Sequence, residues 1–191
     1  MSQRDDLLAG AKKCLVEKGY SRTTARDIAA ASGAHLASIG YHFGSKDKLM
    51  NAAIIEATSE WGDRVEEAVR QARATDPPQR LRTMLAHLFA ATREDRELLV
   101  AGVQPYSQAQ FDEELRSTLA TGFREARVAI AAMILGIAPE EVDEEAEQGI
   151  GGVTYNLVLG YIMQALVDPE SIPDVDTAVA AIQRLAGDAA G

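Results

Sequence analysis

The chain has 191 residues, of which 47% are apolar and 25% charged, and its net charge is −10 at pH 7. This composition is typical of a soluble globular protein of one or two domains. No run of eighteen apolar residues predicts a transmembrane helix, and the N-terminus does not resemble a signal peptide. The single cysteine, Cys14, excludes an internal disulfide, so we expect a cytoplasmic protein with no membrane partner.

The charge is distributed unevenly along the chain. Residues 1–50 contain eight Lys or Arg and five Asp or Glu, a balance of +3, which leaves −13 for the remaining residues. DNA phosphates repel an acidic protein, but a basic head on an acidic body suits a protein that touches DNA with one end only. Chance clustering is the alternative explanation of the same balance.

Helical patterns cover nearly the whole chain, and no strand-like alternation or Asn-Gly hairpin signal occurs. A first helix is expected over 5–18 and should end at Gly19. The segment 24–27, Thr-Ala-Arg-Asp, has capping-box spacing and predicts a short helix over 25–32, which Gly33 ends.

A third helix is expected over 36–42, with Ile39 and Phe43 as its inward pair. Ser45 can cap a long fourth helix, and Pro105 is expected to separate two later helices. The helices expected after the third cover about 46–73, 77–92, 94–102, 107–136 and 139–167, followed by a last one that Asp174 or Asp176 caps and that ends near Gly187. The predicted fold is all-α, with about nine helices.

Two short helices joined through Gly33 behind a longer helix form a unit of helix-turn-helix type. The second short helix has to enter a major groove about 12 Å wide. With Ile39 turned inward, the helical step of about 100° turns Ala37, Ser38 and Tyr41 outward. These side chains are small or polar enough for that position.

This segment closely resembles the DNA-binding domain of the tetracycline-repressor (TetR) family. The resemblance is near-continuous here, and beyond residue 50 it is architectural only. The residues that match the family pattern are Thr23, Thr24, Ile28, Ala29, Ser32, Gly33, Tyr41, His42, Phe43, Gly44, Ser45, Lys46 and Leu49.

The resemblance implies a role for each matching position. Thr24 would donate to a phosphate while also capping its helix, and Tyr41, His42 and Lys46 would contact backbone phosphates. The alternatives are core packing for Tyr41, a structural hydrogen bond to the fourth helix for His42, and plain exposure for Lys46. Ala37 and Ser38 would face bases, with His35 and Leu36 at the rim. The predicted DNA-binding residues are Thr24, His35, Leu36, Ala37, Ser38, Gly40, Tyr41, His42 and Lys46.

Two positions depart from the family pattern. Most members carry Tyr where this chain has Gly40, and a glycine inside a helix costs about 1 kcal/mol in propensity. It also removes a phosphate contact, which Tyr41 is placed to replace. His35 stands where Ser or Asn usually caps the third helix, so the cap is weaker. We therefore expect methyl contacts and DNA shape to carry much of the sequence specificity.

We expect residues 1–48 to form the DNA-binding domain, and 49–191 a helical body that dimerises and binds a small-molecule effector. Two helices from each subunit would form an intersubunit four-helix bundle, with packing inside one chain as the alternative. A twofold dimer presents two recognition helices about 34 Å apart, as a palindromic operator requires. The apolar stripes that suggest this bundle are Leu119, Phe123, Ala126, Ile130, Met133 and Ile134 on one helix, and Ile150, Val153, Leu157, Tyr161 and Ala165 on the other.

Aromatic, methionine and polar side chains of the body are candidates for the effector cavity that the resemblance implies. Plain core packing is the alternative for the apolar members, and surface exposure for the polar ones. The predicted ligand-binding residues are Trp61, Met84, His87, Phe89, Gln104, Tyr106, Phe111, Phe123, Tyr155, Asn156 and Met163.

An enzyme and a protein-binding helical adaptor are the competing classes. No glycine-rich phosphate loop follows a strand, and His35 and His42 would lie about 10 Å apart along a helix, too far to share a metal. The acidic run 140–147 lacks the oxygen pattern of a calcium loop. We predict no enzymatic activity, cofactor or metal site. An adaptor would lack salt-sensitive affinity for DNA. The predicted function is a ligand-responsive transcriptional regulator, a repressor that an effector releases from palindromic double-stranded DNA.

Overall fold

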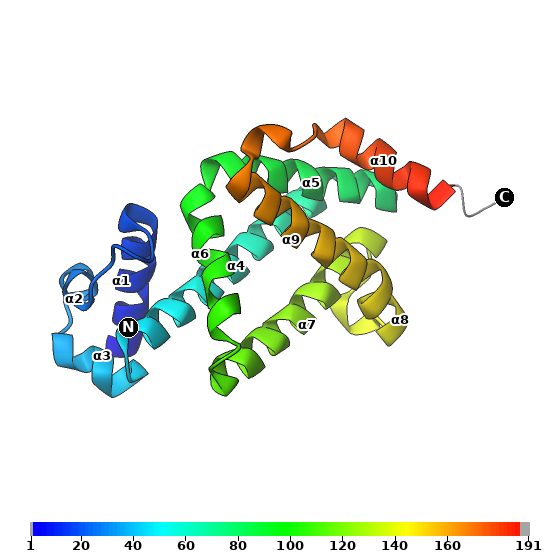
Figure 1. The fold of residues 1–191 in the computed structure, drawn as a ribbon. Helices are drawn as coiled ribbons and strands as arrows, with labels where there is room; N and C mark the ends of the chain where they lie inside the picture. Colours follow the sequence, from blue (N-terminus) through cyan, green and yellow to red (C-terminus); the bar gives the residue numbers. More distant parts are fainter. Residues whose placement is uncertain (1, 188–191) are drawn as a thin grey trace. The chain divides into compact units, whose positions relative to one another are not determined.

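A computed structural model describes residues 2–187, and these form ten α-helices, two of which (α8 and α9) join in one continuous helix, and no strand (Figure 1). The all-α prediction is confirmed. The described chain divides into two compact units, a first unit of residues 2–61 and 97–117 and a second unit of residues 62–96 and 118–187. The boundary expected after residue 48 lies inside a continuous helix, and residues 1–48 as a separate DNA-binding domain stay a prediction.

The first unit holds the expected three short helices and two further segments. Its helices are α1 (Gln3–Lys18), α2 (Ala25–Ser32), α3 (Leu36–Phe43), the first part of α4 (Lys46–Gln71) and nearly all of α6 (Arg96–Gln108). Leu7, Leu15, Ile28, Ile39 and Leu49 are each less than 5% exposed and form its core. Ala101 of α6 is buried in the same cluster, so α6 belongs to the body of this unit.

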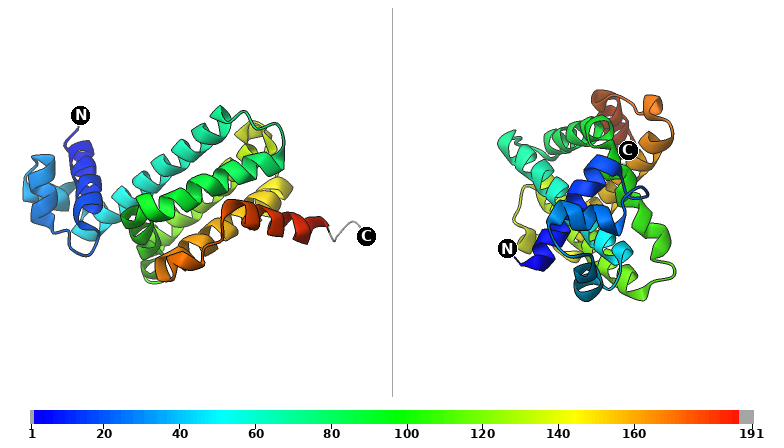
Figure 2. Two further views of the ribbon diagram at one scale, coloured as in Figure 1. Left: turned by 90° about the horizontal axis from the view of Figure 1, so that it is seen from above. Right: turned by 90° about the vertical axis from the view of Figure 1, so that its left-hand side faces the viewer.

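The second unit is built from longer helices (Figures 1 and 2). After the second part of α4 come α5 (Pro77–Glu94), α7 (Glu113–Leu135), α8 (Glu144–Ala146), α9 (Gly152–Val167) and α10 (Val175–Gly187). A π-helical turn, Glu147–Gly151, joins α8 to α9 in one continuous helix. α10 lies beside α5, where Arg82 and Asp176 form an ion pair at 2.8 Å.

Local capping signals place most helix starts correctly. The Thr24 hydroxyl accepts from the Asp27 N–H, and Ser45 accepts from the Lys48 N–H at 3.1 Å. Asp76 accepts from the Gln79 N–H, and Asp174, the first of the two predicted caps, accepts from the Thr177 N–H at 2.9 Å. These side chains satisfy backbone donors that have no partner inside the helix.

Pro105 does not separate two helices, so that prediction is wrong. α6 runs through Pro105 to Gln108, and α7 begins only at Glu113. A proline removes one backbone N–H donor, but the Pro105 ring is fully buried and its carbonyl still accepts from Ala109 N at 3.0 Å. Packing of the ring therefore outweighs the lost hydrogen bond.

The long helix expected from residue 139 also begins later than predicted. Pro139–Glu141 forms a single 3-10 turn, and Asp143 then caps the helix that starts at Glu144 by accepting from Ala146 N at 2.8 Å. Asp143 offers a better cap than Ala138, which has no side-chain acceptor.

The apolar stripes of α7 and α9 mostly pack within the chain. Tyr161 meets Phe89 of α5 edge-on, with ring centroids 5.0 Å apart, and Phe123 meets Tyr155 at 5.5 Å. Ala165 is fully buried. These contacts lie within one chain, but most stripe residues are only half-buried and Val153 is 60% exposed, so the intersubunit bundle stays a prediction.

A different face of α9 is open. Its residues follow the 4-3-4-3 spacing of a helix seam, and none carries a charge. We call this set the α9 seam: Gly149, Val153, Asn156, Gly160, Met163 and Val167, all of them exposed. The helix Glu144–Val167 is long and apolar enough to cross a membrane by length and composition, a property that core helices of soluble proteins share.

Candidate DNA interface

The outward face of α3 is open, as the helical step from Ile39 predicts. Ile39 is 4% exposed and anchors the helix, whereas Tyr41 is 86% and Leu36 48% exposed. Ala37 is also exposed, and Ser38 is half-buried. Within the described residues of its own unit, no later helix covers this face.

The two positions that depart from the family pattern, Gly40 and His35, change the surface and the start of α3. A Cβ built on Gly40 meets no atom within 4 Å, so the position opens onto free space. His35 sits at the N-cap, where it is exposed and makes no side-chain capping bond. The expected weak cap is confirmed, and the start of α3 keeps unsatisfied N–H donors.

Tyr41, His42 and Lys46 are close to one another at the end of α3 and the start of α4. The Tyr41 and His42 rings meet edge-on at 4.9 Å. His42 Nε2 lies 3.3 Å from Gln3 Oε1, so its structural partner is on α1 and not on the fourth helix. The Lys46 ammonium lies 3.0 Å from Asp47 Oδ1 and 5.4 Å from the centre of the Tyr20 ring.

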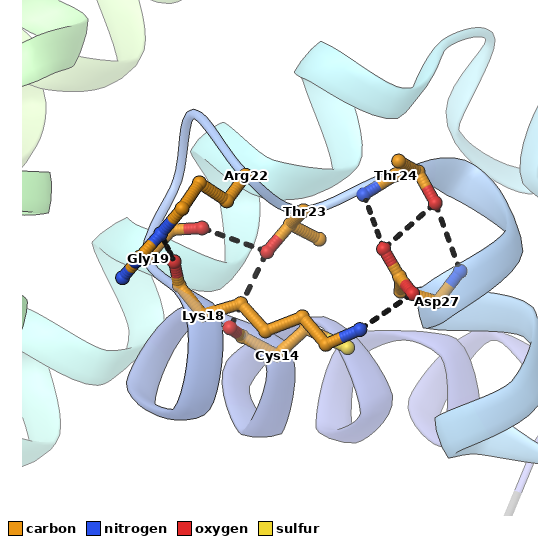
Figure 3. A network of polar contacts seen from close by, with 7 residues as sticks. All are labelled: Cys14, Lys18, Gly19, Arg22, Thr23, Thr24 and Asp27. Atoms are coloured by element: carbon orange, nitrogen blue, oxygen red, sulfur yellow. Dashed lines mark hydrogen bonds and ion pairs between the residues drawn. The ribbon is translucent and has the colours of Figure 1, made fainter.

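A dense polar network holds the start of α2 against the end of α1 (Figure 3). The Thr23 hydroxyl lies 2.8 Å from the Gly19 carbonyl and 3.3 Å from that of Cys14. Lys18 Nζ pairs with Asp27 at 2.6 Å. The turn between α1 and α2 is thereby fixed to α1 by the side chains of Thr23 and Asp27.

Asp27 organises this network. The Lys18 ammonium and the Thr24 hydroxyl and N–H hold the pKa of the Asp27 carboxyl well below its ordinary value. The Thr24 hydroxyl lies 2.7 Å from Asp27 Oδ2 and donates to it, so it already has an acceptor. What remains open at this helix start are the backbone N–H groups of Ala25 and Arg26, which the capping box leaves free.

Two cations that the sequence reasoning counted only as charge border this surface. Arg26, in the first turn of α2, is exposed and has no partner among the described residues. The Arg4 guanidinium lies 5.0 Å from the centre of the Phe43 ring, at the C-terminal end of α3. Their place in the first turns of α2 and α1 was a usable signal, because first turns project toward the same side as an anion-binding helix start.

The predicted ligand-binding residues are divided between the two units, and their role stays a prediction. Trp61, Gln104, Tyr106 and Phe111 belong to the first unit, and the other seven to the second. Met84 and Phe89 are buried core residues, and Phe111 is 95% exposed. Phe123 and Tyr155 are in contact, and His87, Asn156 and Met163 are exposed.

The second unit contains a pocket of about 320 Å³ between the ends of α4 and α7 and the start of α5. None of the predicted ligand-binding residues lines it. Its wall combines apolar and cationic side chains, and the lining residues are Glu66, Val69, Arg70, Arg73, Ala74, Arg80, Ala129, Ala132, Met133, Gly136, Ile137 and Pro139.

Known proteins are similar to both the segment and the whole chain. Residues 7–53 match the model of the bacterial regulatory proteins of the tetR family. The HTH-type transcriptional regulator BetI of Brucella melitensis is 23% identical over 181 residues, which cover 95% of this chain and 88% of that protein. The HTH-type transcriptional repressor AcnR of Corynebacterium efficiens is 34% identical over 67 residues, 35% of this chain and 36% of that protein.

The fold is shared with solved structures. A TetR transcription regulator from Haloarcula marismortui superposes with a TM-score of 0.64 at 23% identity, covering 95% of each chain. The match extends well beyond the first three helices, so the helical second unit is also common to both.

Proposed function

The chain belongs to the tetR family of bacterial regulatory proteins, and on that premise we propose that it is a cytoplasmic transcriptional repressor that binds palindromic DNA as a homodimer and releases it on binding an effector. The observation that carries this proposal is the outward face of α3. Tyr41 is 86% exposed there, and the same unit carries the cation of Lys46 at the start of α4 and the exposed cation of Arg26 in the first turn of α2. A transcriptional regulator of this kind has no need of a catalytic centre.

We assign the contacts to DNA by their chemistry. Leu36, Ala37 and the open position of Gly40 fit the floor of a major groove, where apolar groups contact thymine methyls. Few strong base-reading groups accompany them, so DNA shape contributes to specificity. Phosphate contacts fall to Tyr41, His42, Lys46, Arg26 and the free N–H groups at the start of α2, because phosphate oxygens accept from cations and helix N-termini. Thr24 then acts as the cap of α2, and His35 and Ser38 lie at the rim.

The α9 seam supports the homodimer. Its six residues are exposed and uncharged, and a Cβ at Gly149 or Gly160 would meet no atom within 4 Å. Small residues at a seam with 4-3 spacing let a second helix approach closely. We therefore propose that the two subunits pair through α9. Asn156 and Met163, first considered for the ligand, are assigned to this seam.

We assign the effector to the pocket of the second unit. Arg80 Nη1 donates to the carbonyls of Ile134 and Leu135, at 3.3 and 3.0 Å, while its Nε and Nη2 groups have no acceptor among the described residues. Arg73 has no side-chain partner in that part of the chain either. Two open guanidinium groups beside the apolar Val69 and Met133 suit an organic acid with a compact apolar body.

Opposing charges limit the affinity of this pocket. Glu66 is part of the lining, Arg70 already pairs with Glu67, and the carbonyl end of α7 adds about half a negative charge. The free donors of Arg73 and Arg80 therefore select a ligand with a negative charge. The apolar side chains of the pocket limit the size of that ligand.

Binding to DNA from upstream of the protein's own gene tests the proposal, with fluorescence anisotropy at several salt concentrations. Lys46→Ala should weaken binding to any sequence and lower the salt slope by about 0.9, the value of one phosphate contact. Tyr41→Ala should weaken binding without sequence preference. Arg93→Ala, an exposed cation of α5 in the second unit, is the matched control. Affinity that is insensitive to salt and to Lys46 would favour the helical adaptor.

Octanoate tests the effector assignment, with octylammonium as the cation of equal length. Octanoate should raise the melting temperature and lower the affinity for DNA, and Arg73→Gln should remove both effects, whereas Arg93→Gln should keep them. Equal stabilisation by octylammonium would overturn the assignment of an acid. Stabilisation by octanoate with unchanged DNA affinity would overturn its role in release.

A further inference from the structure

Three polar side chains in the first unit close a ring of hydrogen bonds. The Tyr20 hydroxyl lies 3.4 Å from Asn51 Oδ1, Asn51 Nδ2 lies 3.2 Å from Gln108 Oε1, and Gln108 Nε2 lies 3.4 Å from the Tyr20 hydroxyl. Each member donates once and accepts once around the ring. We call these residues the Tyr20 triad.

The triad joins three separate segments. Tyr20 lies in the connection between α1 and α2, Asn51 in the second turn of α4, and Gln108 is the last residue of α6. Asn51 is only 7% exposed, so its amide depends on the other two for hydrogen bonds. Two of the three bonds, both made by the Tyr20 hydroxyl, are 3.4 Å long, beyond the common range of about 2.7 to 3.2 Å.

The Tyr20 ring lies next to Lys46, which we predict to contact a DNA phosphate. Lys46 Nζ lies 5.4 Å from the ring centre, within the range of a cation–π interaction. Its other partner is its neighbour Asp47, at 3.0 Å. The ring therefore limits where the ammonium goes when a phosphate replaces Asp47, and the hydroxyl of the same ring is bonded to α4 and α6.

α6 packs in the first unit and also connects it to the second unit along the chain. Residues 97–117 belong to the first unit, but the chain on both sides of them belongs to the second. Lys48 of α4 also pairs with Glu114, just beyond α6, at 2.7 Å. Gln108 therefore lies in a segment that the covalent chain joins to the second unit at both of its ends.

We infer that Tyr20, Asn51 and Gln108 are positioning residues for DNA binding, which set the place of the Lys46 ammonium and make it depend on α6. This inference rests on the proposed DNA contact of Lys46. The triad does not touch DNA. It acts on the affinity through Lys46, and its contribution disappears when Lys46 is absent.

A double-mutant cycle on the affinity for upstream DNA tests the inference. Tyr20→Leu removes ring and hydroxyl and should lower the affinity about threefold, with a smaller salt slope. Tyr20→Phe keeps the ring but removes the hydroxyl that bonds to Asn51 and Gln108, so it should lower the affinity about twofold, less than Tyr20→Leu. Gln108→Ala should lower the affinity about twofold, and Gln104→Ala, a half-buried glutamine of the same helix, should not. In a Lys46→Ala background none of these changes should matter.

Two results would overturn the inference. One is that Tyr20→Leu and Gln108→Ala weaken the Lys46→Ala protein as much as they weaken the unmodified one. The other is that they lower the affinity with no change in the salt slope, as a loss of folded protein would. If Gln108→Ala does not fold, Gln108→Met keeps the length of the side chain, adds no charge and removes both hydrogen bonds, and the same cycle applies.

A measurement without DNA separates this inference from the proposed function. The Tyr20 ring should shift the NMR signals of the Lys46 side chain upfield. Tyr20→Leu should abolish this shift, Gln108→Ala should change it, and Gln104→Ala should leave it unaltered. If DNA binding fails but these shifts behave as expected, the positioning stands. If the Lys46 signals ignore Tyr20 and Gln108, the positioning is wrong whatever the DNA affinity.

Discussion

The helices α3 and α9 each present an open face, and the two faces differ in charge. The first unit presents Ala37 and Tyr41, both exposed on α3, together with the exposed cation of Arg26 on α2 and the cation of Lys46 at the start of α4. The α9 seam carries no ionisable side chain. A polyanion is attracted by cations around a slim helix, whereas a second copy of the chain gains from uncharged surface with room for close packing. The contrast supports the proposal that DNA binds the first unit and that the subunit partner binds the second.

Placing a charge on the α9 seam should have the largest effect. Val153 is 60% exposed, so Val153→Glu leaves the fold of one chain intact but buries an unpaired carboxylate in the proposed interface. The dimer should dissociate, as sedimentation measures. Affinity for the operator should fall by about 100-fold or more, because each recognition helix then binds alone.

A matched substitution distinguishes the seam from a general effect of charge. Ala120→Glu adds the same charge at an exposed position of α7, and it should leave both the dimer and the DNA affinity unchanged. If the Val153→Glu protein is still dimeric, α9 does not form the subunit interface. The proposal that the uncharged face of α9 binds the second subunit would then be wrong.

Removing the unpartnered cation of α2 should have a smaller effect on the same affinity. Arg26→Gln should weaken binding about fivefold and lower the salt slope by about 0.9. The order of preference among DNA sequences should stay the same, because a phosphate contact carries no base information. Arg93→Gln is the control. A changed sequence preference with an unchanged slope would place Arg26 at the bases instead of the phosphates.

The first unit was the more predictable part of the chain because its signals are local. Gly19 and Gly33 end their helices with positive φ values of 76° and 69°, and the capping box of Thr24 and Asp27 starts α2. Each signal acts within four residues and needs no knowledge of the rest of the fold. The inward place of Ile39 then fixes which side of α3 is open.

Other features depend on distant packing that no local pattern contains. Tyr161 faces inward because Phe89 of another helix receives it, and α6 continues past Pro105 because that ring is buried. The pocket lining was equally hidden, since Arg80 reaches it by capping the carbonyls of α7, a helix distant in the sequence. Periodicity shows that a stripe is apolar but does not identify its partner.

A substitution at Gly40 tests, through the free energy of unfolding, whether the outward face of α3 is uncovered. A Cβ there meets nothing within 4 Å, and its φ is not positive. Gly40→Ala should therefore raise the free energy of unfolding by about 0.5 to 1 kcal/mol, in urea titrations. Gly33 has the same free space but a φ of +69°. Gly33→Ala should thus destabilise the protein by about 1 kcal/mol. Destabilisation by both would mean that the outward face of α3 is covered.

The smallest expected effect is on the pH dependence of the unfolding free energy, and it comes from two Asp–Thr helix caps, one in each unit. Asp27 is bonded by Lys18 and Thr24, and Asp174 mainly by the N–H and hydroxyl of Thr177, with no cation among the groups that lower its pKa. Both interactions lower the pKa of the carboxyl below its ordinary value of 3.8. A lowered pKa means that the stabilisation is complete above the unfolded value and is lost as the pH falls through the folded value. The difference in unfolding free energy between the unmodified protein and Asp27→Asn should therefore shrink from about pH 6 to about pH 3.

Salt should separate the two caps. The Lys18–Asp27 pair is exposed, so added salt screens it, whereas the bonds of Asp174 come from a neutral hydroxyl and backbone N–H groups. The effect of Asp27→Asn should consequently decrease between about 0.01 M and about 1 M salt, and that of Asp174→Asn should not. Equal salt dependence for both would show that the cation of α1 contributes nothing to the start of α2, and that the turn before the DNA-binding helices is held by its caps alone.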